Sequence, residues 1–143
     1  MKKNKRMTRM LVTIAMFMLL VPMVANASNK SFSFNVTTNT NGGKQYSAVN
    51  IKDDSDPAYV KTTYSNLLSS DLFYYRVVAT AAKNREACSA YRRVSKSDIS
   101  EPSDSRYKIS IQYYSGYAWA GAERCLEGDT DKYSVSASGM WWS

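Results

Sequence analysis

The chain of 143 residues contains no histidine, and this limits the chemistry that its side chains can perform. The Ser-His and Cys-His pairs that activate nucleophiles need an imidazole base, and imidazole is also a common ligand of zinc. Hydrolysis by a carboxylate pair needs two acids that face each other across a cleft, which a small β-sheet domain rarely provides. We therefore predict that the protein is not an enzyme and binds no cofactor.

Two short acidic segments could offer oxygen ligands to calcium. They cover residues 53–56, Asp-Asp-Ser-Asp, and residues 127–131, Glu-Gly-Asp-Thr-Asp. Neither has the spaced ligands, central glycine and distal glutamate of an EF-hand loop. Because aspartate and glycine are also common turn residues, we interpret both segments as solvated turns and predict no metal site.

Aromatic residues are abundant, and several are neighbours in the sequence. The chain has eleven tyrosines, four phenylalanines and three tryptophans. Neighbours in a strand face opposite sides of the sheet, so one member of a pair can be buried while the other points away from the core. We assign Trp141 to the core, and Tyr74, Tyr114 and Trp142 to the exterior. These three either reflect the high β propensity of aromatic residues or form a flat platform for sugar rings, wall polymer or a partner protein.

The first 27 residues have the three parts of an export signal. Residues 1–9 contain five basic and no acidic side chains, residues 10–24 are predominantly apolar, and Ala25-Asn26-Ala27 is a small-x-small cleavage site. The apolar run is about 15 residues long, whereas a membrane-spanning helix needs about 20. We therefore predict a helical signal peptide over residues 1–27, cleavage between Ala27 and Ser28, and one secreted domain over residues 28–143.

Removal of the signal peptide changes how the charge and the cysteines are interpreted. Residues 28–143 keep 14 basic and 12 acidic side chains, a net charge of +2, which is not the clustered basic surface of a nucleic-acid-binding protein. Cys88 and Cys125 are the only cysteines. In an exported protein an even number of cysteines favours a disulfide, which would stabilise the fold by about 3–4 kcal/mol. The alternative is two separate buried thiols that act as small apolar residues.

Apolar and polar residues alternate along most of residues 28–143, as in half-buried strands. Phe32, Phe34 and Val36 alternate with polar residues, and a similar pattern recurs up to the C-terminus. Gly128 and Asp129 predict a turn. We expect an all-β fold, an antiparallel β-sandwich of about seven or eight short strands. The expected strands cover residues 31–36, 46–51, 58–64, 72–81, 86–94, 107–114, 117–126 and 133–142.

Three short motifs in this domain carry a family resemblance. They are Phe-x-Phe at residues 32–34, Gly-Ala-Glu at residues 121–123, and Tyr-x-Val-Ser-x-x-Gly-x-Trp at residues 133–141. With these motifs the chain resembles a family of small exported proteins of Gram-positive bacteria, domain of unknown function 2712, although the cysteines and Ala137-Ser138 depart from that pattern. The resemblance implies a β-rich exported domain and no particular activity. The chain is also similar to bacteriocins of the lactococcin 972 type, short exported β-sandwiches with aromatic C-termini, but lacks their start rich in tryptophan and glycine.

These features together lead to a functional expectation. We expect an extracellular, non-catalytic binding or surface-interaction module whose partner is a cell-wall polymer, a glycan or another envelope component. No nucleic-acid partner and no membrane span after cleavage are expected. One alternative is a bacteriocin-like effector that acts on a competitor's envelope. Another is a matrix protein that self-associates through the edges of its sheets.

Overall fold

The computed structural model describes residues 29–37, 43–68, 71–80, 85–130 and 134–143. The predicted signal peptide and its cleavage site between Ala27 and Ser28 lie outside these residues. Within them, no helix is both long enough and apolar enough to cross a membrane. All the described strands begin after residue 28.

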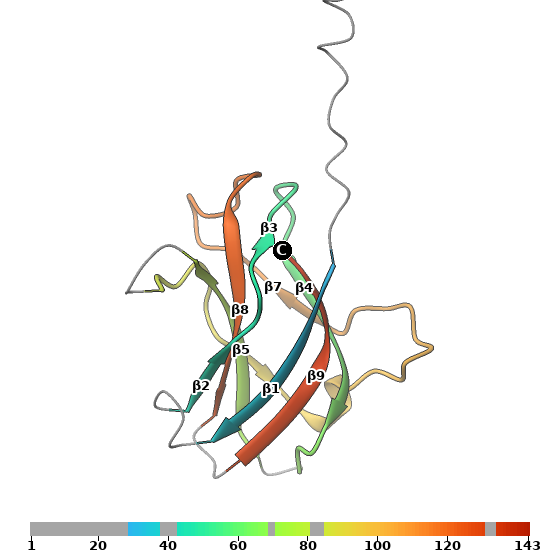
Figure 1. The fold of residues 1–143 in the computed structure, drawn as a ribbon. Helices are drawn as coiled ribbons and strands as arrows, with labels where there is room; N and C mark the ends of the chain where they lie inside the picture. Colours follow the sequence, from blue (N-terminus) through green and yellow to red (C-terminus); the bar gives the residue numbers. More distant parts are fainter. Residues whose placement is uncertain (1–28, 38–42, 69–70, 81–84, 131–133) are drawn as a thin grey trace, which may run out of the picture.

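Two antiparallel sheets face each other across a shared core (Figure 1). The four-stranded sheet contains, in spatial order, β1 (Lys30–Thr37), β9 (Ser134–Trp142), β4 (Ala58–Ser65) and β7 (Ile109–Ile111). The five-stranded sheet contains β2 (Lys44–Tyr46), β8 (Glu123–Thr130), β5 (Phe73–Ala79) and β6 (Arg92–Val94), with β3 (Asn50–Ile51) also paired to β8. A short 3₁₀ turn, η1 (Lys96–Asp98), follows β6. The all-β class and the two antiparallel sheets predicted from the alternation are confirmed.

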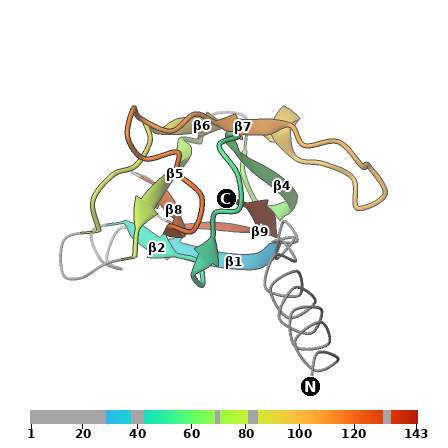
Figure 2. The same cartoon turned by 90° about the horizontal axis from the view of Figure 1, so that it is seen from above.

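The two sheets also approach each other at their edges, where β1 lies beside β2 and β6 lies beside β7 (Figure 2). At the first edge the Asn35 backbone N–H donates a hydrogen bond of 2.6 Å to the Gln45 side-chain oxygen. At the second edge Ser89 and Tyr113 form an isolated antiparallel bridge. Each edge therefore has the other sheet beside it, which leaves less free backbone for pairing with another chain.

Aromatic rings fill the space between the sheets. Phe32 of β1 and Phe73 of β5 both pack edge-on against Tyr75, with ring centroids 5.6 and 5.1 Å away. Trp141 is fully buried in the same cluster, while its neighbour Trp142 is only half-buried. The faces predicted for the C-terminal strand are therefore confirmed.

The predicted turn at Gly128 and Asp129 is wrong, because both residues lie inside β8. Gly128 pairs with Tyr75 in the sheet, and a Cβ atom at this position would lie 2.6 Å from the Phe34 ring and 3.0 Å from the Phe73 ring. The glycine is thus a strand residue that gives room to aromatic side chains.

Several other predicted strands differ from the observed ones in length or position. The strand expected over residues 117–126 begins only at Glu123, and the segment before it is a loop with a positive φ of 85° at Gly121. The strand expected over residues 46–51 is divided into β2 and β3. Those expected over residues 86–94 and 107–114 are reduced to the three-residue strands β6 and β7.

The predicted disulfide is wrong: Cys88 and Cys125 are both free and buried. Strand β5 lies between them, because the Cys88 N–H donates to the Val77 carbonyl on one side and Cys125 pairs with Val78 on the other. Two strand spacings of about 4.8 Å each exceed the separation of about 7 Å that a disulfide tolerates. The thiols also point to opposite faces of the sheet. Cys88 belongs to the core cluster. Leu126 belongs to it as well, so its neighbour in the strand, Cys125, faces the outer side.

We therefore predict that both thiols resist alkylation in the folded protein and react fully after denaturation without any reductant. Burial protects them in the native state, and each is a protonated thiol because burial raises its pKa. Mass spectrometry after treatment with iodoacetamide measures the adducts. If denatured protein gained adducts only after reduction, the thiols would be joined and the arrangement described above would be incorrect.

Candidate functional site

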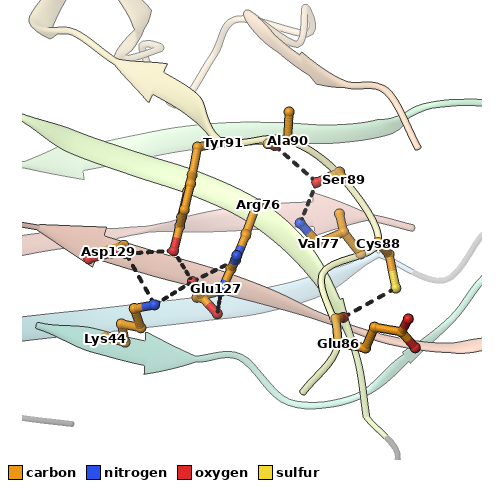
Figure 3. A network of polar contacts seen from close by, with 10 residues as sticks. All are labelled: Lys44, Arg76, Val77, Glu86, Cys88, Ser89, Ala90, Tyr91, Glu127 and Asp129. Carbon is orange, nitrogen blue, oxygen red and sulfur yellow. Dashed lines mark hydrogen bonds and ion pairs between the residues drawn. The ribbon is translucent and has the colours of Figure 1, made fainter. Parts of the chain in front are cut away.

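A network of charged and hydroxyl groups covers part of the outer face of the five-stranded sheet (Figure 3). At its centre the Glu127 side chain is fully buried. The Nε atom of Arg76 lies 2.8 Å from its Oε1 atom, and the Arg76 Nη2 atom donates to Oε2 at 3.0 Å. The Tyr91 hydroxyl oxygen lies 2.7 Å from Oε1 and 2.6 Å from a carboxylate oxygen of Asp129, so the two acids share its single proton as a hydrogen-bond donor. Lys44 lies 3.6 Å from Asp129.

Strand register explains why these side chains meet. Arg76 of β5 and Tyr46 of β2 are both cross-strand partners of Glu127, so the three side chains share one face. The Tyr91 ring covers the pair from the segment before β6, with the Arg76 guanidinium 4.4 Å from its centroid. Burial, followed by its hydrogen bonds to Asp129 and Glu127, raises the pKa of Tyr91 and keeps its hydroxyl a donor.

This network is a structural element of the sheet. Its carboxylates are occupied by Arg76, Lys44 and Tyr91, so they are not available to a metal or a substrate. Among the described residues, no group of three or more histidine, cysteine, aspartate or glutamate side chains could hold a metal ion. Residue 131, the end of the predicted acidic cluster, lies outside the described residues.

The three aromatic residues predicted to be exposed lie in different places. Tyr74 is half-buried on the outer face of the five-stranded sheet, where its ring is 6.0 Å from that of Tyr91. Trp142 lies on the outer face of the four-stranded sheet, 4.4 Å from the ring of Tyr107. Tyr114 is 46% exposed in the segment after β7. Because Tyr74 and Trp142 belong to different sheets, the three do not form one platform.

A cleft of about 310 Å³ opens at the end of the five-stranded sheet, where β5 ends and β8 begins. We call it the Trp119 cleft, after the tryptophan on its wall, whose side chain is 59% exposed. An aromatic side chain on the wall of a hollow is the kind of group that lines ligand pockets in proteins. Its lining residues are Ala79, Thr80, Glu86, Gly116, Tyr117, Trp119, Glu123 and Arg124.

Arg124 provides a cation in the wall of this cleft and is only 4% exposed. Its two terminal nitrogens donate to the backbone oxygens of Glu123 and Tyr117, both at 2.8 Å. Its Nε atom is buried without a hydrogen-bond partner, and no carboxylate of the described residues lies within 4 Å of the guanidinium. The group lies 5.6 Å from the Trp119 ring. A buried donor that is left unpaired in this way carries a desolvation cost.

Two carboxylates complete the polar part of the cleft. Glu123 accepts a hydrogen bond of 2.8 Å from the Thr80 hydroxyl, and Glu86 accepts one from the Tyr117 hydroxyl. This hydrogen bond raises the pKa of Tyr117. The cleft therefore combines an exposed apolar ring with one guanidinium and two carboxylates.

Sequence reasoning missed Trp119 because the surrounding residues were interpreted as a strand. The available signal was its position in Ala118-Trp119-Ala120-Gly121-Ala122, where a single large ring is flanked by small residues. Glycine at a positive φ and small neighbours favour a loop that exposes the ring.

Comparisons with protein-family models, with curated proteins and with solved structures found no match to this chain. The resemblance inferred from short motifs remains a hypothesis, and the site is interpreted from its own geometry.

The buried ion pair yields a prediction about stability. Replacing Arg76 by Met should lower the free energy of unfolding by about 2–4 kcal/mol, because it leaves the carboxylate of Glu127 buried without its main partner. The double variant Arg76→Met/Glu127→Leu should recover most of this loss, since it removes the unpaired charge as well. Urea denaturation of the two variants and the parent measures the difference. A cost below about 1 kcal/mol for Arg76→Met would show that the pair does not hold this face together.

Proposed function

We propose that the exported domain is a non-catalytic binding module that takes a sugar unit of an extracellular glycan in the Trp119 cleft. The observation that carries this proposal is the 59% exposed indole of Trp119 on the wall of a cleft that also contains the carboxylates of Glu86 and Glu123. The rest of the cleft supplies hydrogen-bonding groups within a volume of about 310 Å³, which is at the lower end of ligand pockets in proteins.

The chemistry of the cleft suits a sugar ring. A pyranose has an apolar face of C–H groups and a rim of hydroxyl or acetamido groups. The apolar face can stack on an indole, which offers a large rigid surface at little cost in conformational entropy. The rim can donate to the carboxylates of Glu86 and Glu123. An apolar ligand would leave these polar groups desolvated and unpaired.

Further observations support a binding role without catalysis. Burial raises the pKa of Cys88 and Cys125, so neither thiol has the thiolate character that nucleophilic catalysis needs. The two acids of the cleft already accept hydrogen bonds from Thr80 and Tyr117. The Tyr117 hydroxyl, whose pKa is raised, is a poor general base at neutral pH.

Export follows from the leader sequence, and it determines which glycans the domain meets. A signal peptide over residues 1–27 delivers the domain outside the cytoplasm, where cell-wall polymers are the abundant glycans of a bacterial surface. The resemblance to a family of exported Gram-positive proteins agrees with this setting. We therefore assign the ligand to the glycan strands of the cell wall.

Binding to purified cell-wall glycan should depend on Trp119. We expect Trp119→Ala to weaken binding at least about tenfold, the size of effect that a central aromatic contact gives, without a change in the melting temperature, because the side chain is largely exposed. Isothermal titration calorimetry with soluble wall fragments, using the chain from Ser28 onwards, measures the affinity.

The matched control is Tyr64→Ala, which removes an aromatic ring that is 58% exposed on β4, away from the cleft. It should leave the affinity unchanged. Equal binding by the parent and Trp119→Ala, or no binding of wall fragments by the parent, would contradict the proposal. Arg124→Met provides a second test, in which sugar binding should fall although Trp119 is intact.

A further inference from the structure

A second cleft, of about 240 Å³, lies beside the outer face of the four-stranded sheet where β9 ends. We call it the Trp142 cleft. Trp142 and Tyr59 are cross-strand partners in β9 and β4, and Tyr107 lies between them. The Tyr107 ring centroid is 4.4 Å from that of Trp142 at an interplanar angle of 66°, and 5.4 Å from that of Tyr59. Three aromatic rings at differing angles thus border one hollow.

The charge of this cleft is negative. Asp53 and Asp54 both line it. Asp54 has a partner, the Lys52 ammonium at 3.4 Å, whereas Asp53 has no ion-pair partner within 4 Å among the described residues. The π-faces of aromatic rings also carry negative potential. The rings and the Asp53 carboxylate therefore attract the same kind of ligand, a cation.

The acidic segment is held in place by a buried lysine. Lys52 is fully buried, lies 4.5 Å from the centroid of the Tyr113 ring and donates to the backbone oxygen of Asp56 at 2.5 Å. This contact fixes the turn that carries Asp53 beside the rings. Ser143, which is 7% exposed, also lines the cleft, and its hydroxyl is buried without a hydrogen-bond partner. The cleft therefore contains one polar group that its own neighbours do not satisfy.

We propose that the Trp142 cleft binds a quaternary ammonium group, such as the trimethylammonium of choline. Quaternary ammonium ions are held in proteins by aromatic rings that face them from several sides. They carry no N–H donors, so the rings can replace their hydration shell while one carboxylate at the rim balances the charge.

This inference is independent of the proposed sugar site. The Trp142 cleft lies on the four-stranded sheet, and the Trp119 cleft lies at the end of the five-stranded sheet. The two share no lining residue. Failure of one proposal therefore does not decide the other.

Isothermal titration with choline chloride tests the proposal, using the chain from Ser28 onwards. The neutral isostere 3,3-dimethylbutan-1-ol has the same shape without the charge and is the matched ligand control. We expect choline to bind and the alcohol to bind at least about tenfold more weakly, because the cation–π attraction and the carboxylate act only on the charged ligand.

Three variants locate the site. Tyr107→Ala, which removes a ring that is 44% exposed outside any strand, should weaken choline binding at least about tenfold, and Asp53→Asn should weaken it several-fold. Trp119→Ala should leave it unchanged. The melting temperature checks that each variant is folded. The proposal is overturned if choline does not bind at about 50 mM, a concentration well above the ~1 mM dissociation constant of a weak site. It is also overturned if the alcohol binds as well as choline does, or if Tyr107→Ala and Asp53→Asn leave choline binding unchanged.

The same group occurs on free choline and on lipid headgroups, and vesicles distinguish these sources. Sedimentation of the protein with phosphatidylcholine vesicles, and not with phosphatidylglycerol vesicles, would assign the ligand to a lipid headgroup. Choline binding without sedimentation would assign it to a soluble or polymer-borne ammonium compound. Both outcomes support a quaternary ammonium site.

Discussion

The packing of aromatic rings against a glycine in β8 is the constraint on which the rest of the molecule depends. A Cβ atom at Gly128 would overlap the Phe34 ring at 2.6 Å and press on Phe73 at 3.0 Å, so the two sheets reach their observed separation only because this side chain is absent. Protein cores are packed as closely as organic crystals and tolerate little added volume. In the same core, the hydroxyl of Tyr75 in β5 and the hydroxyl of Thr62 in β4 lie 3.0 Å apart. This hydrogen bond joins the two sheets.

The direction of β8 follows from this packing and determines the two regions outside the core. With Leu126 and Gly128 facing inwards, Glu127 must face outwards, where it meets Arg76 and Tyr91 and requires the charged network of Figure 3. The same alternation turns Arg124 towards the inner side at the start of β8, where its partner in the sheet is Ala79, the last residue of β5. The Trp119 cleft is thus a consequence of where the two strands begin and end.

The sequence predicted the architecture well where a side chain's environment depends on alternation alone. Phe32, Phe34 and Trp141 face the core as the period of two requires. It failed where distant residues decide the outcome. Gly128 was interpreted as a turn residue because its local signal is that of a turn, and only the rings of β1 and β5 make it a strand residue. The cysteine count favoured a disulfide, but the position of β5 between the two residues is a property of strand order, which neither spacing nor composition specifies. Trp119 was missed for a similar reason, since a loop that exposes a ring depends on where β8 begins.

We propose that a sugar of the cell wall occupies the Trp119 cleft. The indole N–H resonances of Trp119, Trp141 and Trp142 in a two-dimensional ¹H–¹⁵N NMR spectrum test it directly, because the three rings lie in the cleft, in the core and on the other sheet. During titration with a soluble wall glycan, we expect the Trp119 signal to shift in a saturable way while the signals of Trp141 and Trp142 stay in place. A shift of the Trp142 signal alone, or no shift of the Trp119 signal at saturating glycan, would contradict it.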